Sequence, residues 1–585
     1  MKKTFTNAQV ATLLTNVAAV LSLNGENFFR IKAFQNAASS IEGYPVQIMD
    51  VWKEGKLDEI PGIGKALKND ISELFTEGKV EYFDELMSTV PAGLFALMDI
   101  PGIGPKNGLK LATFFKLTKA STAVKELYAR AEAGEISELD GFTPVGEKRI
   151  MEAIKAMRDK PEERLPLPDA LSIAAQVIEY LQKDGNVLKA EVLGSLRRRN
   201  PTTGDVDIAV ATHHTQEIFE RIKQFPSQKR IIGSGEKSLA FVHSSGWQVD
   251  VKTVDPESWG SMLQHFTGSK LHNVHLRTDA LKKGLSLNEF GIEFEGKRET
   301  FDSEEKFYTR LGLQWVPPEL REDSGEIELA RKNALPKLIE LSDLKGDFHI
   351  HTNFPFPTSH DLGESSVDDI LTTAKELGYT SLGFSDHNPK RAGLSAQERV
   401  AIIKERNDHI RETVDRFFKG KTPSIQVSCG MEVDILPDGT MALEDEAMQE
   451  LDYVIASVHS SFTQDRKTAT ARVIKAITHP LITIMGHPSG QLIQSRAGID
   501  VDWDEVFAAA KEHGKIMEIN ATPSRTDLSS HLIKRALDMG VKLMINTDAH
   551  QASGLYQMQY GVWNARRGWA SAQAIENTKT LRFSR

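Results

Sequence analysis

The sequence predicts a multidomain chain with an all-α N-terminal region, an α+β middle and a C-terminal seven-stranded β/α barrel. Two near-identical glycine turns lie in the N-terminal helical pattern. Two aspartates spaced one apart open an apolar run in the middle, and seven short apolar runs follow residue 344, nearly all of them ending in His, Asp or Glu. At 585 residues the chain exceeds the size at which one hydrophobic core stops growing, so several domains are expected.

Composition indicates the cellular compartment of the protein but says little about its function. Cys429 is the only cysteine, which excludes an internal disulfide framework and fits a reducing compartment. No apolar run is long enough to cross a bilayer, and the start lacks the apolar segment of a secretory signal. We therefore expect a cytoplasmic protein with no membrane partner. The net charge of -10 decides little, because a whole-chain sum can conceal a basic face on one domain.

The glycine turns occur in LDEIPGIGKALKNDI (57–71) and LMDIPGIGPKNGLKL (97–111). Two glycines around an aliphatic residue allow a tight turn and expose the N–H groups of the next helix, which suits a phosphate. This helix-hairpin-helix pattern, present twice, indicates sequence-independent binding of the DNA backbone; alternatively, the turns only join helices. The predicted DNA-binding residues here are Arg30, Gly62, Gly64, Lys65, Gly102 and Gly104.

The middle of the chain carries three aspartates on two predicted strands. In GDVDIAV (204–210), side chains alternate, so Asp205 and Asp207 share the face opposite Val206 and Ile208. About forty residues later, GWQVDVKTV (246–254) places Asp250 on the polar face of a second strand. Three carboxylates from neighbouring strands suit a two-metal site, although a solvent-facing strand end is the simpler alternative. Upstream, the Gly-Ser turn and the arginines of GSLRRR (194–199) suit the binding of phosphates.

Taken together with HFTGSKLHNVHLR (265–277), these motifs resemble DNA polymerase family X, the repair polymerases related to polymerase beta, over about residues 1–320. The resemblance implies a nucleotidyltransferase palm with a thumb, Mg²⁺ or Mn²⁺ on Asp205, Asp207 and Asp250, and Asp250 helping to deprotonate the primer 3′-hydroxyl. It implies template contact by Arg277. The implied nucleotide-binding residues are Gly194, Ser195, Arg198, Gly204, His265, Phe266, Gly268 and Asn273.

Two positions depart from this family. His265 replaces the tyrosine of a Tyr-Phe pair that helps to exclude ribonucleotides, which leaves the stringency of sugar choice open. Asp70 stands where some members have a lysine that forms a Schiff base with a deoxyribose 5′-phosphate. Because a carboxylate cannot be that nucleophile, we expect weak or no lyase activity.

The seven C-terminal runs, from GDFHIH to KLMINTDAH, predict parallel strands with a ligand rim at their carboxyl ends. Eleven of the 17 histidines lie between His349 and His550. Mixed histidine and carboxylate ligands suit Zn²⁺, Mn²⁺ or Fe²⁺, and a cluster this large indicates two or three ions acting on a phosphoester. The candidate ligands on these strands are His349, His351, His387, Glu432, His459, His487, Asp548 and His550.

This ligand order resembles the PHP domain, named for polymerases and histidinol phosphatases, over about residues 340–575. Bacterial family X polymerases join the two in this order, which implies a 3′–5′ exonuclease. The segment TNFPFPTSHDLGESS (352–366) replaces a usual short segment that ends in Ser-Asp-Gly, so the ninth ligand is Asp361 or His360. This departure leaves full nuclease activity open.

The predicted division is an N-terminal gap-binding domain (1–90), fingers (91–160), palm (161–255), thumb (256–318), linker (319–343) and PHP domain (344–585). The predicted function is gap filling in DNA repair with trimming of 3′ ends, by a monomer that binds gapped or primed duplex DNA and deoxynucleoside triphosphates. The alternatives are a metal-dependent phosphoesterase whose N-terminal half only binds DNA, a non-catalytic DNA-end scaffold, and a nucleotidyltransferase with another acceptor.

Overall fold

The computed structural model describes residues 5, 7–42, 48–53, 55–60, 62–100, 102–159 and 164–584. The chain divides into two compact units, residues 1–162 and 163–585. The predicted palm boundary at 160–161, and Pro61 and Pro101 of the two glycine turns, lie outside the described residues. Among the helices that are described, none combines the length and the apolar character needed to span a membrane.

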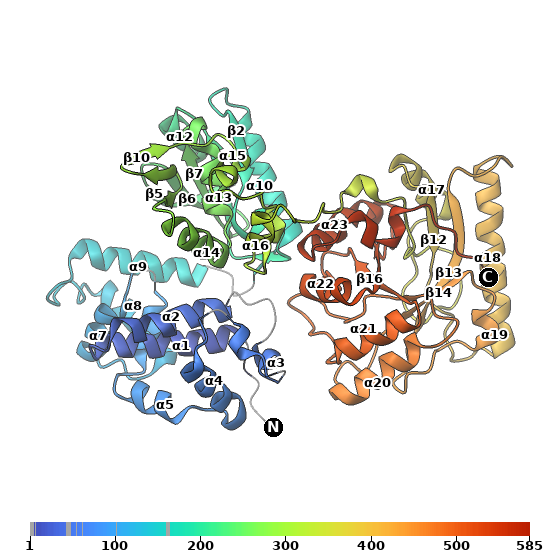
Figure 1. Cartoon of the computed structure of the whole chain (residues 1–585), viewed down its shortest axis with the longest axis horizontal. Coiled ribbons are helices and arrows are strands. Elements are labelled where there is room, and N and C mark those ends of the chain that lie inside the picture. Colours follow the sequence, from blue (N-terminus) through green and yellow to red (C-terminus); the bar gives the residue numbers. More distant parts are fainter. Residues whose placement is uncertain are drawn as a thin grey trace. The chain divides into compact units, whose positions relative to one another are not determined.

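The first unit is helical (Figure 1), as the sequence predicted. Gly62 and Gly102 adopt φ of 87° and 90°, a left-handed conformation that glycine accepts without strain. Gly64 and Gly104 then precede the first residues of α4 and α7. Both glycine turns therefore lead directly into a helix. The helices are α1 (Asn7–Leu23), α2 (Phe28–Glu42), α3 (Ile48–Lys53), α4 (Lys65–Glu77), α5 (Glu81–Ser88), α6 (Gly93–Met98), α7 (Pro105–Phe114), α8 (Ala120–Glu132) and α9 (Pro144–Asp159).

A five-stranded sheet forms the predicted palm in the second unit, with strand order β2-β4-β7-β6-β5. β4 and β7 pair in parallel, whereas the other neighbours are antiparallel. Alternate residues of β4, among them Val206 and Ile208, enter one hydrophobic core, as the alternation predicted. The elements are β1 (Leu165–Pro166), α10 (Leu167–Gln182), β2 (Lys189–Val192), α11 (Gly194–Arg197), β3 (Thr202–Thr203), β4 (Val206–Ala211), α12 (Thr215–Lys223), β5 (Gln228–Ser234), β6 (Ser238–His243) and β7 (Gln248–Val254).

The predicted thumb packs two helices and a small antiparallel sheet around one core. The predicted linker, 319–343, contributes Leu320, Ile327 and Leu338 to that core. Ile327 lies on the buried side of the short helix α16. The elements are α13 (Trp259–Thr267), α14 (Lys270–Leu281), β8 (Ser286–Asn288), β9 (Gly291–Phe294), β10 (Lys297–Glu299), α15 (Glu304–Arg310) and α16 (Glu326–Arg331).

The C-terminal part is a seven-stranded parallel sheet in simple sequential order, covered by helices (Figure 1). All seven predicted runs form strands. A parallel bridge between Ile350 and Ala549 joins the first strand to the last, so the sheet nearly closes into a barrel. Its elements are β11 (Gly346–Asp347), α17 (Val367–Glu376), β12 (Ser381–Phe384), α18 (Ala396–Phe417), β13 (Gln426–Asp434), α19 (Asp445–Met448), β14 (Tyr453–Ser457), α20 (Arg466–Ile477), β15 (Ile484–Met485), α21 (Trp503–Glu512), β16 (Ile516–Asn520), α22 (Ser530–Met539), β17 (Lys542–Asn546) and α23 (Met558–Arg567).

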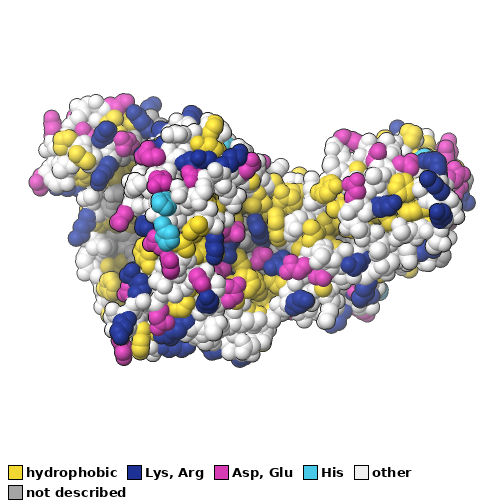
Figure 2. All heavy atoms as spheres, turned by 90° about the horizontal axis from the view of Figure 1, so that it is seen from above, with side chains coloured by type: hydrophobic (Ala, Val, Ile, Leu, Met, Phe, Trp, Pro, Cys, Tyr) yellow, Lys and Arg dark blue, Asp and Glu magenta, His cyan; other side chains and the backbone are white. Residues whose placement is uncertain are grey.

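The surface mixes charges of both signs. Figure 2 shows basic and acidic side chains interspersed over the visible face of the molecule. The net charge of -10 therefore does not correspond to a single acidic field on that face.

Candidate active sites

The register of β4 and β7 brings two of the three predicted palm carboxylates side by side. Asp207 and Asp250 are direct Cα partners in this parallel pair, and Asp205 immediately precedes β4. Gly194 lies against the same group: a Cβ built on it would lie 3.0 Å from Asp207 Oδ2, and its φ is 58°. The predicted Gly-Ser turn therefore needs glycine here, and the turn adjoins the aspartates.

Two of these carboxylates already accept hydrogen bonds, one from an ammonium group and one from an amide. Lys252 Nζ donates to Asp207 Oδ1 at 2.6 Å, and Gln248 Nε2 donates to Asp250 Oδ2 at 2.8 Å. Among the described residues, every group of three or more candidate ligand atoms within 4.8 Å of one another lies in the barrel. Metal ions at the palm would have to compete with the Lys252 ammonium for Asp207.

The predicted phosphate-binding residues lie next to these carboxylates along the chain. Ser195 Oγ is 2.7 Å from Thr203 Oγ1, just ahead of Gly204 and Asp205. Arg198 Nη1 donates to the Thr267 carbonyl at 2.5 Å, which joins the arginine turn to the Phe-Thr-Gly-Ser motif. A Cβ on Gly268 would lie 3.1 Å from Arg198 Nη1. The two predicted motifs therefore form one local structure.

The predicted base and sugar contacts surround His265. The ring of His265 lies 4.7 Å from that of Phe266, centroid to centroid. Asn273 Nδ2 donates to the His265 carbonyl at 2.7 Å, and Arg277 Nη2 lies 3.2 Å from His265 Nδ1. Burial lowers the pKa of His265, which favours the neutral ring. A neutral aromatic ring beside Phe266 can still stack on a sugar or base.

The first glycine turn lines a cavity of about 840 Å³ that also includes Arg30, Lys65 and Asp70. Arg30 Nη2 donates to the Tyr82 hydroxyl at 2.8 Å. Burial, followed by repulsion from Glu73, raises the pKa of Asp70. Lys68 instead donates to Asp58 at 2.5 Å. The cavity thus has basic groups suited to a phosphate, with a carboxyl where a nucleophilic lysine would be required.

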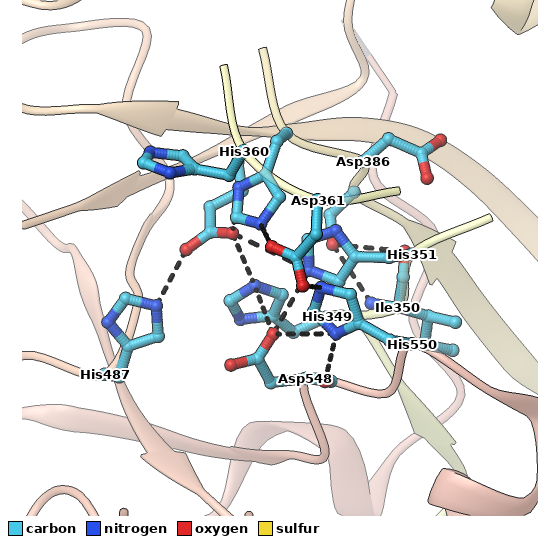
Figure 3. A network of polar contacts seen from close by, with 12 residues as sticks. His349, Ile350, His351, His360, Asp361, Asp386, His487, Asp548 and His550 are labelled. Atoms are coloured by element: carbon cyan, nitrogen blue, oxygen red, sulfur yellow. Dashed lines mark hydrogen bonds and ion pairs between the residues drawn. The ribbon is translucent and has the colours of Figure 1, made fainter. Parts of the chain in front are cut away.

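The barrel rim brings the predicted ligands together (Figure 3). Of the eight ligands predicted on strands, seven lie just beyond the carboxyl end of their strand and Glu432 lies near the end of β13, the edge where parallel sheets gather functional groups. The structure forms four overlapping groups with ligand atoms within 4.8 Å of one another: His351, His387 and His550; His349, His351, Glu432 and Asp548; His387, Glu432 and His459; and His360, Asp434 and His459. His487 joins through its Nε2, which is 2.8 Å from Glu432 Oε1.

Glu432 is the centre of this cluster. It is fully buried on β13, yet histidines surround it on several sides, with His387 Nδ1 at 2.9 Å and His349 Nε2 at 3.3 Å from Oε2. Burial favours its neutral form, but His387, His349 and His459 outweigh burial and hold the pKa of Glu432 well below its ordinary value. Burial likewise opposes protonation of His349, but Glu518, Asp548 and Glu432 raise its pKa well above the usual range.

The donor set fits divalent metal ions. Several buried polar atoms of the cluster make no hydrogen bond within the described residues, among them His351 Nδ1 and His487 Nδ1. The other four reach a partner only at ion-pair distance, without the geometry of a hydrogen bond: His349 Nε2, His387 Nδ1, Glu432 Oε2 and His550 Nε2. Buried polar atoms in proteins are normally hydrogen-bonded, and such a concentration of exceptions calls for an ion or bound water. Histidine nitrogens with carboxylate oxygens are ligands that transition-metal ions accept.

The altered 352–366 segment contributes two neighbouring residues that point to different partners. Asp361 Oδ1 lies 3.7 Å from His387 Nε2, and its Oδ2 lies 3.6 Å from His550 Nε2. His360 Nε2 lies 2.9 Å from Asp434 Oδ1, beside His459 (Figure 3 labels His360 and Asp361). The structure thus brings Asp361 to His387 and His550, the two histidines that form a group with His351.

Sequence reasoning missed two carboxylates that support the ligands. Glu518 Oε1 is 2.7 Å from His349 Nδ1, and Asp434 Oδ1 is 2.7 Å from His459 Nδ1. A carboxylate on the second nitrogen fixes the ring and its tautomer. Glu518 lies inside KIMEIN (515–520), the one predicted run to which no ligand was assigned, and a glutamate within a buried strand was the available signal.

Comparisons with known proteins agree with this architecture. Three family models match: Helix-hairpin-helix domain at residues 5–80, DNA polymerase beta thumb at 262–322 and PHP domain at 347–522. The DNA polymerase/3′-5′ exonuclease PolX of Bacillus subtilis (strain 168) is 33% identical over 579 residues, which cover 98% of this chain and 97% of that protein. The chain belongs to the PolX family. The resemblance drawn from the motifs, with its PHP domain, is therefore confirmed.

Other relatives match a much shorter part of this PolX chain. A protein named "Probable phosphatase" from Thermoanaerobacter sp. (strain X514) is 28% identical over 214 residues, or 35% of this chain and 78% of its own length. Another from Caldanaerobacter subterraneus subsp. tengcongensis is 30% identical over 220 residues, or 35% of this chain and 75% of its own length. The full-length match separates this PolX chain from those shorter proteins.

Proposed function

We infer that this PolX chain is a template-directed DNA polymerase that fills short gaps during repair, and that its barrel is a 3′–5′ exonuclease. The Bacillus subtilis relative carries both activities in its name and matches over nearly the whole chain. The observation that carries the polymerase assignment is the register of β4 and β7, which places Asp207 beside Asp250 and next to the Gly194 turn.

In the palm, Asp205, Asp207 and Asp250 would hold Mg²⁺ or Mn²⁺. Such ions lower the pKa of an attacking hydroxyl and neutralise a triphosphate and its pyrophosphate leaving group. Asp250 accepts the proton of the primer 3′-hydroxyl. Asp207 would exchange the Lys252 ammonium, 2.6 Å away in this structure, for such an ion.

The incoming nucleotide lies along the Gly-Ser-Leu-Arg-Arg-Arg turn and the Phe-Thr-Gly-Ser motif, which Arg198 joins. Ser195 and Arg198 donate to the triphosphate, and Gly194, Gly204 and Gly268 allow close approach of the backbone. His265 and Phe266 lie near the sugar, Asn273 faces the minor-groove edge of the base, and Arg277 contacts the template. Each role is inferred from the position of the residue in its motif.

In the barrel, two or three Mn²⁺, Zn²⁺ or Fe²⁺ ions would share nine ligands. When bound, they supply an activated water and charge neutralisation for phosphoester cleavage. We assign Asp361 rather than His360 to the ninth place, because Asp361 approaches both His387 and His550. The full set is His349, His351, Asp361, His387, Glu432, His459, His487, Asp548 and His550.

The N-terminal region binds the DNA substrate, which is a gapped or primed duplex. Deoxynucleoside triphosphates are the co-substrates. Gly62, Gly64, Gly102 and Gly104 present backbone N–H groups to DNA phosphates. Arg30 and Lys65 line a cavity for a 5′-phosphate, and Asp70 in the same cavity makes lyase activity weak or absent. We propose that the protein works as a cytoplasmic monomer.

The test uses a duplex with a one-nucleotide gap and a labelled primer, incubated with Mn²⁺ with and without deoxynucleotides. We expect the primer to lengthen with nucleotide and to shorten without it. Asp250→Asn should abolish only lengthening, and His349→Ala only shortening. A matched control, Asp255→Asn, changes an exposed carboxylate one residue beyond β7 and should leave both rates unchanged.

Each other outcome would contradict a different part of the proposed function. Lengthening without shortening in Mn²⁺, Zn²⁺ and Fe²⁺ alike would contradict the exonuclease and implicate the altered 352–366 segment. Shortening alone would leave a phosphoesterase whose N-terminal half binds DNA. Loss of both activities in either variant would mean that the two sites are not separate.

A further inference from the structure

Helix α23 of the barrel packs with one side on the barrel strands and with its end on the palm. A Cβ on Gly561 would lie 2.4 Å from Ile545 on β17, so this helix packs tightly against the barrel. On its other side, Trp563 packs against the palm core, and the Arg199 guanidinium lies 4.4 Å from its ring. The helix ends in Arg566 and Arg567, which bind different partners.

Arg567 reaches the turn that carries the nucleotide-binding residues. Its Nη1 donates to the Arg198 carbonyl at 2.8 Å, to the side chain of Asn200, and to Glu322 Oε1 at 3.1 Å. The same Glu322 oxygen accepts from Arg198 Nε, also at 3.1 Å. One carboxylate oxygen therefore links an arginine of the barrel to the predicted triphosphate arginine of the palm.

This link is largely shielded from solvent. The side chains of Arg567 and Arg198 are 11% and 12% exposed, and Glu322 is 25% exposed. Charge pairs and hydrogen bonds are stronger in such surroundings than at the surface. Although burial favours a neutral Glu322, the charges of Arg198 and Arg567 lower its pKa, so the carboxylate stays ionised between them.

We propose that Arg567 is a positioning residue of the polymerase site: through Glu322 and the Arg198 carbonyl it holds Arg198 in place for the triphosphate. This rests on the proposed nucleotide-binding role of Arg198. Loss of Arg567 would weaken the binding of the triphosphate by Arg198 in two ways. Without Arg567, the Glu322 charge is balanced by Arg198 alone, which weakens the pull of Arg198 on phosphate. The Arg198 backbone also loses a direct hydrogen bond.

Arg566 provides a matched control. It precedes Arg567 on the same helix, is 13% exposed, and binds Glu319 and Glu340, both at 2.8 Å, without contacting Glu322 or Arg198 in the described contacts. A residue that only holds the barrel against the palm would behave like Arg566. A positioning residue would differ from it in nucleotide affinity.

The experiment measures single-nucleotide insertion into gapped DNA by full-length protein and separates kcat, the KM for deoxynucleotide and the KM for DNA. We expect Arg567→Met to raise the nucleotide KM about tenfold, the scale of losing one charge-assisted hydrogen-bonding group. The DNA KM and the exonuclease rate should stay within about twofold. Arg567→Lys should give an intermediate nucleotide KM, and Arg566→Met should leave it unchanged.

The double variant Arg198→Met/Arg567→Met decides the route. If Arg567 acts through Arg198, the double variant has the nucleotide KM of Arg198→Met alone. Additive effects, or equal losses in Arg566→Met and Arg567→Met, would overturn the proposal. An Arg198→Met variant with unchanged nucleotide KM would instead refute the proposed role of Arg198. Should Arg567→Met lose exonuclease activity through misfolding, the Arg567→Lys comparison decides.

Discussion

At the scale of single residues, Glu518 shows how a buried carboxylate can serve the barrel site without being one of the nine proposed ligands. It contacts His349 Nδ1 at 2.7 Å and accepts from the His487 backbone N–H at 2.6 Å. Burial favours its neutral form, but His349 outweighs burial and lowers the pKa of Glu518. Glu518 thus orients two of the proposed ligands at once.

Glu518→Gln keeps the shape but removes the charge that orients His349. Because loss of such a supporting carboxylate typically weakens metal binding 10–100-fold, we expect a drop of about that size in metal affinity and a matching loss of exonuclease. Metal titration followed by elemental analysis measures the drop. Glu512→Gln, an exposed change on α21, is the control. Unchanged metal affinity in Glu518→Gln would remove this role.

Glu304 in the thumb gives a pH prediction. It is buried between Arg197 and Arg321, with carboxylate contacts of 2.8 Å and 2.6 Å. Burial raises its pKa, but the two arginines outweigh burial and bring the pKa of Glu304 down to about 2. A carboxyl whose folded pKa is depressed stabilises the fold above its unfolded pKa of about 4.5.

We therefore expect stability from Glu304 to be complete above pH 4.5 and to be lost as the pH falls toward 2. At neutral pH, Glu304→Gln should lower the free energy of unfolding of this region by about 3 kcal/mol. It should also flatten the dependence of the unfolding midpoint on pH between 4.5 and 2. Glu299→Gln, which changes an exposed partner of Arg310, should alter the free energy by less than about 0.5 kcal/mol.

At the scale of elements, the pairing of β4 with β7 places the proposed metal ligands of the palm and also Lys252, which competes with metal ions for Asp207. The register that places Asp207 beside Asp250 also pairs Lys252 with Ala209, two positions further on. Lys252 lies on the same face as Asp250 because side chains two apart share a face. One strand pairing therefore supplies both carboxylates and an ammonium group that neutralises one of them.

Lys252→Met should increase the affinity of the palm for Mg²⁺. Removing one positive charge near the carboxylates changes the interaction by about 1 kcal/mol, which corresponds to a roughly fivefold lower half-saturating Mg²⁺ concentration. The measurement is the Mg²⁺ dependence of insertion at saturating nucleotide. Lys237→Met, which changes a lysine 3.6 Å from Asp255, should leave that concentration unchanged. A higher half-saturating concentration in Lys252→Met would contradict the competition.

Much of this could be read from the sequence because ligands close to strand ends leave a short, repeated signature. His459 directly follows an apolar run, His387 lies three residues after Phe384, and Asp205 and Asp207 open a run. Glu518 was missed because a glutamate within a buried strand has no distinctive neighbours. The choice between His360 and Asp361 depends on loop conformation, and the Arg567–Glu322 contact spans 245 residues, so neither leaves a local pattern.

At the scale of the whole molecule, metal ions at the proposed barrel site should stabilise the barrel in particular. Bound ions stabilise only the folded site, and the cluster without them concentrates buried charge. We expect a chelator to lower the temperature of one calorimetric transition by several degrees and to leave polymerase activity, measured after adding Mg²⁺, intact. In Glu432→Gln the chelator should have no effect. A uniform shift of all transitions would contradict a stabilisation that is local to the barrel.

The bridge between Ile350 and Ala549 has a consequence for biosynthesis. The barrel site takes His351 from one end of the domain and Asp548 from the other, 197 residues later. During translation the palm carboxylates are complete long before the last barrel strand exists. A growing chain can therefore bring the palm carboxylates together while the barrel site still lacks Asp548 and His550.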